Sequence, residues 1–153
     1  MAGPLLTHVA NLLSMKGAHL TFREAVAGFP PALRGKKPRG APHTAWQLLE
    51  HMRLAQEDIL DFSRNPKYKE KKFPDDYWPA EPAPPSDAAW DRSVKQFERD
   101  LRAMQSLIGK AANIYAKIPH GQGQTLLREA LLAADHNSYH LGQLVFLRKM
   151  LER

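Results

Sequence analysis

Apolar positions recur at helical spacing in four segments of the chain, which predicts four α-helices. The clearest pattern lies between Ser86 and Gly109, where large apolar side chains alternate steps of four and three. These side chains are Trp90, Val94, Phe97, Leu101, Met104 and Ile108. Ser86 follows two prolines and is a good N-cap, and Asp87 is favourable in the first turn. The pattern is typical of a helix in the core of a bundle.

A second helix is predicted from Thr44 to about Arg64, ahead of Asn65-Pro66. Its start has the form of a capping box, in which Thr44 caps the helix and Gln47 reaches back. The apolar face comprises Leu48, Met52, Ala55, Ile59 and Phe62. His51 falls on that same face, so its imidazole is expected to point into the core.

The remaining two helices lie near the ends of the chain. One is predicted to start near Thr125 and to continue almost to the last residue. One face of it carries Glu129, Ala133, His136, His140, Gln143 and Leu147. The other is predicted from roughly Leu5 to Ala27, although Gly17 interrupts it. Its stripe comprises His8, Leu12, Met15, His19, Phe22 and Val26.

Two long proline-containing connections, residues 28–43 and 65–85, separate these segments. Neither shows the alternation of a strand. Long connections in a small bundle imply crossovers or a covering lid in place of simple hairpins. We therefore expect an all-α fold, a four-helix bundle with long crossover loops, in which residues 1–153 form a single domain.

The composition narrows the chemistry. The chain has 43% hydrophobic and 25% charged residues, as soluble globular proteins do. It contains no cysteine, so any metal must be held by nitrogen and oxygen ligands, and any thiol must come from outside. The first residues lack the features of a signal peptide, and no run approaches the roughly 18 apolar residues of a membrane span. We expect a cytoplasmic protein that does not enter membranes.

The formal net charge of +6 raises the question of nucleic acid. Most of the excess lies in residues 34–39 and 64–72, which carry prolines and are predicted to be loops. Specific binders more often place base-reading residues on a helix or interleave aromatic residues on a sheet. Solvated basic loops are the favoured interpretation, and nucleic acid is not expected as a partner.

The histidines carry the strongest chemical signal. His136 and His140 are four residues apart, which places both imidazoles on one side of a helix and close enough to bind one ion. His51 adds a third inward imidazole from a separate helix. Unpaired buried polar groups cost about 1–3 kcal/mol each, and a divalent ion would satisfy all three at once. Three ligands also leave a coordination position open for water or substrate, and the ligand types leave zinc, nickel and iron as alternatives.

Other polar residues are weaker candidates. His120, in the glycine-rich turn before the last helix, is a candidate acid/base, although the turn itself is an equal explanation. Gln143 could bind substrate or the second nitrogen of a ligand histidine. Glu129 could orient a ligand imidazole, but an ion pair or capping role is as well supported. His43 is assigned to the surface or to helix capping, and His8 and His19 to core packing or a hydrogen bond.

The combination of motifs resembles the DinB-like (DinB/YfiT) superfamily over essentially the whole chain. The resemblance rests on these motifs: Leu48-Leu49-Glu50-His51, the H-x-x-x-H at 136–140 followed by Leu141-Gly142-Gln143, residues 42–47, Asp76-Tyr77-Trp78-Pro79, Pro119-His120-Gly121 and residues 134–137. The resemblance implies a four-helix bundle, often a homodimer, whose nickel, zinc or iron site is built by three histidines. His51, His136 and His140 match those ligands. Despite its name, the superfamily is distinct from the DNA polymerase, so no polymerase activity follows.

Characterised members of that superfamily include metal-dependent transferases and isomerases that use low-molecular-weight thiols such as bacillithiol or mycothiol. The leading hypothesis is therefore a metal-dependent enzyme acting on an unidentified small molecule, with a thiol S-transferase as the first choice. A metal-dependent hydrolase is the alternative, and a non-enzymatic metal- or ligand-binding stress-response protein is the third. A ligand-sized cavity beside the histidines would argue against the third.

Overall fold

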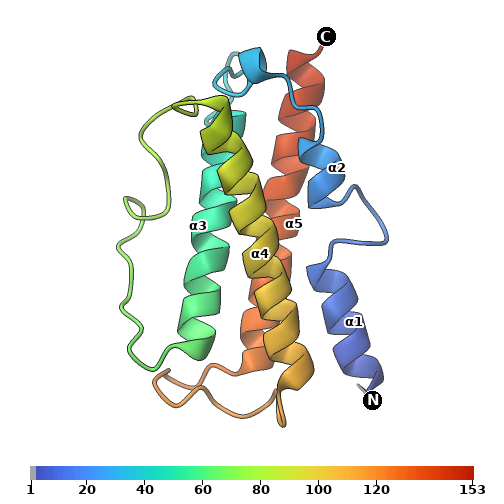
Figure 1. Ribbon diagram of the computed structural model, residues 1–153, viewed down its shortest axis with the longest axis vertical. Helices are drawn as coiled ribbons and strands as arrows, with labels where there is room; N and C mark the ends of the chain where they lie inside the picture. The colour runs from blue at the N-terminus through green and yellow to red at the C-terminus, as the bar shows by residue number, and fades with distance from the viewer. Residues whose placement is uncertain (1–2) are drawn as a thin grey trace.

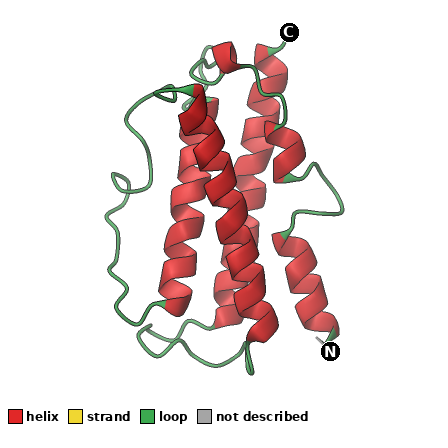
Figure 2. Ribbon diagram, in the orientation of Figure 1, coloured by secondary structure: helices red, strands yellow, loops and turns green. Residues whose placement is uncertain are grey.

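Three long helices and two short ones pack side by side in the computed structural model, which describes residues 3–153 (Figure 1). The elements are α1 (Pro4–Leu13), α2 (Phe22–Val26), the 3-10 helix η1 (Pro31–Leu33), α3 (Ala45–Arg64), α4 (Asp87–Lys110) and α5 (Leu126–Leu151). Figure 2 draws no strand in the described part of the chain. The prediction of an all-α four-helix bundle is confirmed, with α1 and α2 sharing the fourth position along α5.

The three long helices start where side-chain caps were predicted. The Thr44 hydroxyl accepts a hydrogen bond from the Gln47 amide at 3.2 Å, and Gln47 Oε1 accepts from the Thr44 amide at 3.1 Å. Ser86 and Thr125 cap α4 and α5 in the same way, by accepting from the third amide of each helix. These caps satisfy amides that would otherwise have no partner, and they fix which residues of each helix face the core.

The core consists of two apolar clusters along the bundle. The upper one contains the aromatic pair Phe22 and Phe97, with ring centroids 4.0 Å apart, and fully buried Leu49 from α3. The lower one joins Leu13 of α1 to Met104 of α4 and to small residues of α5. Each such side chain contributes about 1.5–3 kcal/mol by leaving water, so packing holds α3 and α5 in register.

The first helical segment differs from its prediction. Instead of one helix from Leu5 to Ala27, the chain breaks after Leu13, and a new capping box at Thr21 starts α2. Just after the C-cap Ser14, Met15 has the left-handed φ of 56° that ends the helix, and Gly17 has φ 135°, which glycine adopts at low cost. The register is also shifted. His8, Leu12 and His19 are exposed, and the buried side chains of α1 are Val9 and Leu13.

The long connections take the form of crossovers. Residues 65–86 lead from the end of α3 back along that helix to the start of α4, so α3 and α4 point the same way (Figure 1). In the other connection, Arg34 is buried, contrary to the expectation of a solvated basic loop. Its guanidinium donates to the Phe29 carbonyl and to Asp87 Oδ1, and it lies over the Trp90 ring. Lys36, Lys37 and Arg39 are exposed, as predicted.

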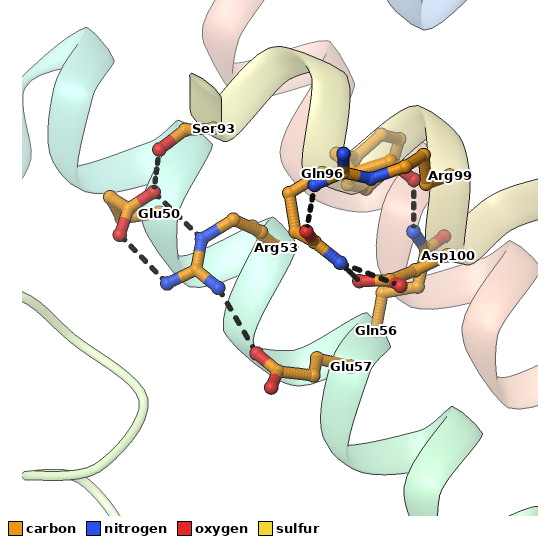
Figure 3. A network of polar contacts seen from close by, with 9 residues as sticks. Glu50, Arg53, Gln56, Glu57, Ser93, Gln96, Arg99 and Asp100 are labelled. Carbon is orange, nitrogen blue, oxygen red and sulfur yellow. Dashed lines mark hydrogen bonds and ion pairs between the residues drawn. The ribbon is translucent and has the colours of Figure 1, made fainter. Parts of the chain in front are cut away.

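A polar network joins α3 to α4 (Figure 3). Glu50 accepts from Ser93 and binds Arg53 through both carboxylate oxygens, and Arg53 also reaches Glu57 at 3.0 Å. These contacts hold the helix that carries His51. None of the helices within residues 3–153 combines the length and apolar character that a bilayer span requires.

Candidate metal centre

Three histidine side chains from α3 and α5 converge on one point beside the core. His51 is on α3, and His136 and His140 lie one turn apart on α5. The Nε2 atom of His51 is 3.0 Å from Nε2 of His136 and 3.1 Å from Nε2 of His140. One potential ligand atom from each ring lies within 4.8 Å of the other two. The structure therefore brings together the three residues that the sequence predicted.

The second nitrogen of two of these rings determines which nitrogen is protonated. Nδ1 of His51 lies 2.9 Å from the Tyr77 carbonyl oxygen, and Nδ1 of His140 lies 2.7 Å from Gln143 Oε1. Both partners only accept hydrogen bonds, so both Nδ1 atoms must carry the proton. In a neutral imidazole the other nitrogen then has a lone pair. The lone pairs of His51 and His140 face each other across 3.1 Å, where no hydrogen bond can form.

Protonation does not relieve this contact at neutral pH. Burial, with a smaller contribution from the neighbouring His140, lowers the pKa of His51 to about 4, although the hydrogen bond to Tyr77 acts in the opposite direction. Burial also lowers the pKa of His136 to about 4, with His140 and His51 adding to the effect. The pKa of His140 is lowered by burial as well. His51 and His140 therefore direct nitrogen lone pairs at one point, with Nε2 of His136 beside them, and this arrangement forms a site for a cation.

The geometry fits a divalent metal ion. Two nitrogens that each lie about 2.0–2.1 Å from one ion are separated by roughly 2.9–3.4 Å at angles between a right angle and the tetrahedral angle. The separations of 3.0 and 3.1 Å between the Nε2 atoms fall in that range. The hydrogen bonds from Nδ1 to Tyr77 and Gln143 are the partners that metal-bound histidines normally have. Nδ1 of His136 is buried and has no partner among the described residues.

An aromatic stack covers one side of the site. The Trp78 ring lies parallel to the His51 ring, with centroids 3.7 Å apart and an interplanar angle of 4°. His43 stacks on Trp78 with centroids 3.9 Å apart. Beside the three histidines, a cavity of about 470 Å³ is lined mainly by apolar and aromatic residues, among them Phe73, Trp78 and Leu132. Such a volume can hold a small molecule.

The other candidate residues occupy different places. Gln143 binds the second nitrogen of His140, one of the two roles foreseen for it. His120 Nε2 donates to the Phe62 carbonyl at 2.7 Å, and no hydrogen bond joins it to the triad in residues 3–153. It lines a neighbouring cavity that shares Asp58 and Tyr77 with the histidine cavity, so its acid/base role stays a prediction. Glu129 is paired with Arg128 at 2.7 Å, which supports the ion-pair alternative.

Sequence reasoning missed the loop residues that complete the site. In the sequence, Tyr77 and Trp78 stand out only as part of a motif, and the position of His43 predicts a surface or helix-capping role. Helical periodicity cannot place them, because they lie outside the helices and His51 meets them only after the chain folds. Asp58 was missed although it follows His51 by seven residues on the same face of α3.

Comparison with known proteins identifies the family. The model of the DinB superfamily matches residues 17–144, which include all three histidines and the crossover loop. No curated protein and no solved structure gives a significant match. A match over this share of the sequence, joined to a three-histidine cluster in a helical bundle, is sufficient for assignment. The chain belongs to the DinB superfamily.

Proposed function

We propose that this protein is a metal-dependent enzyme whose divalent ion is held by His51, His136 and His140. One observation carries the proposal: the fixed tautomers of His51 and His140 place two lone pairs 3.1 Å apart, and only a cation between them makes the contact favourable. Nickel and zinc suit imidazole ligands, and iron is compatible. When bound, the ion supplies a positive charge that lowers the pKa of a thiol or water beside it.

We propose further that the reaction is a thiol-dependent S-transfer. Membership of the superfamily supports this assignment, and so does the lack of any cysteine in the chain, which leaves the thiol to an external low-molecular-weight compound. The apolar cavity beside the histidines supports a small-molecule substrate and speaks against a closed metal-storage site. In this site Trp78 excludes water from one face of His51, and Gln143 holds the proton of His140 away from the ion.

Metal analysis of the purified protein tests the site. Wild-type protein should hold about one divalent ion per chain, and His136→Ala should hold far less. His19→Ala is a suitable control, because His19 is exposed and its Nδ1 donates to the Leu20 carbonyl. Wild-type protein without a stoichiometric ion, or a His136→Ala variant that holds as much, would refute the proposal. Turnover of a small electrophile that needs no added thiol would favour hydrolysis over S-transfer.

A further inference from the structure

A buried carboxylate lies close to the metal centre, and no cationic partner for it is found within residues 3–153. Asp58 is on α3 two turns after His51, and its side chain lines the histidine cavity. A buried carboxylate is costly unless hydrogen bonds replace its water. In Asp58 both oxygens accept from tyrosine hydroxyls, Oδ2 from Tyr77 at 2.7 Å and Oδ1 from Tyr68 at 3.0 Å. Both tyrosines belong to the crossover loop, so this carboxylate fastens the loop to α3.

Tyr77 connects this carboxylate to the triad. Its hydroxyl donates to Asp58, while its main-chain carbonyl accepts the proton of His51 Nδ1 at 2.9 Å. The next residue, Trp78, lies flat on the His51 ring. Two properties of His51 therefore depend on where the loop is held: which nitrogen is protonated, and how the ring is oriented.

We propose that Asp58 is a positioning residue, which holds Tyr77 through its hydroxyl so that the Tyr77 carbonyl keeps His51 in the tautomer that presents Nε2 to a metal ion. The Asp58 carboxylate does not touch His51 itself and acts on it through Tyr77 of the crossover loop. The effect on metal affinity rests on the proposed function, whereas the effect on the tautomer does not.

The chemistry of the two hydroxyls supports this arrangement. Burial, together with the hydrogen bond to the Asp58 carboxylate, raises the pKa of Tyr68 to about 12. The pKa of Tyr77 is raised by the same causes. Both hydroxyls therefore remain donors at physiological pH. The two tyrosines differ, however, because Tyr77 also contacts His51 through its main-chain carbonyl, whereas Tyr68 contacts Asp58 alone of these two residues.

That difference gives a matched test. Tyr77→Phe and Tyr68→Phe each remove one hydroxyl from the same carboxylate and leave the main chain intact. Affinity for Zn²⁺ alone, measured by competition with a chromogenic chelator, should fall about tenfold in Tyr77→Phe, the lower end of the range for groups that orient ligands. It should fall by less than about threefold in Tyr68→Phe and stay unchanged in Tyr115→Phe, a surface control whose side chain is exposed.

A second measurement uses the metal-free protein. ¹⁵N chemical shifts of the imidazole rings report the tautomer of each histidine. Wild-type His51 should be protonated at Nδ1, and Tyr77→Phe should shift His51 toward a mixture of both forms, while Tyr68→Phe should not. If Tyr77→Phe does not fold, Asp58→Asn, which keeps the side-chain shape, should show the same shift.

An unchanged His51 tautomer in folded Tyr77→Phe or Asp58→Asn would overturn the proposal, and so would an equal loss of affinity in both phenylalanine variants. A lower unfolding midpoint without a tautomer shift would show that Asp58 is merely structural. If wild-type protein binds no Zn²⁺ but the tautomer shift occurs, the proposed function fails and the positioning role of Asp58 stands.

Discussion

Replacing Gln143 by leucine removes the acceptor that keeps the His140 proton on Nδ1. A metal ion needs the lone pair of Nε2, so the bound state of this variant would leave the Nδ1 proton buried and unpaired. Changes to such partners typically reduce metal affinity 10–100-fold, which corresponds to about 1.4–2.7 kcal/mol. We expect a loss in this range for Gln143→Leu.

The metal-free protein should respond differently. Without Gln143, His140 can move its proton to Nε2 and donate it to Nε2 of His51, 3.1 Å away. The variant thus exchanges one hydrogen bond, worth about 0.5–1.5 kcal/mol, for another, and it loses the contact between two lone pairs. We expect the free energy of unfolding of the metal-free variant to lie within about 1 kcal/mol of wild type.

Two assays separate these effects. Chelator competition gives the metal affinity, and urea unfolding with EDTA gives the stability of the metal-free protein. Gln143→Glu is the matched control, because a carboxylate still accepts from His140 Nδ1 and should retain the affinity. Wild-type affinity in Gln143→Leu would refute the assignment of the tautomer. A loss of several kcal/mol in its metal-free stability would refute the rearrangement.

Two further results are expected. His51 and His136 have a pKa of about 4 in the folded protein against 6.5 in the unfolded chain, so the unfolded chain binds more protons between these values. The free energy of unfolding of the metal-free protein should therefore fall as the pH drops from 6.5 to 4, by at most about 1.4 kcal/mol per pH unit for each ring. Urea unfolding that gives the same free energy at every pH in this range would contradict the prediction. Thr44→Ala removes the cap of α3 and a hydrogen bond to the Pro82 carbonyl, and should cost about 1–2 kcal/mol by urea unfolding, whereas Thr44→Ser should retain most of the stability.

The sequence allowed the helices and the ligands to be predicted because both depend on local periodicity. Capping residues such as Thr44 mark helix starts, and a spacing of four puts His136 and His140 on one face. Where a signal is not periodic, prediction failed. The burial of Arg34 depends on tertiary contacts, as does the position of Trp78 over His51. The metal's identity, the thiol, the homodimer and the cytoplasmic location remain predictions.

Residues of α1 and of the last turn of α5 lie outside the segment that matches the superfamily, yet they pack against it. The match to the superfamily covers residues 17–144, yet Leu13 lies in the same apolar cluster as Met104. Beyond the other boundary, Arg148 donates to the main-chain carbonyls of Ala25, in α2, and of Ala27 and Gly28, which follow that helix. A fragment trimmed to the matched residues would expose one side of the core and free the end of α2. The matched segment is thus shorter than the set of residues that pack together, and an engineered fragment should end outside both boundaries.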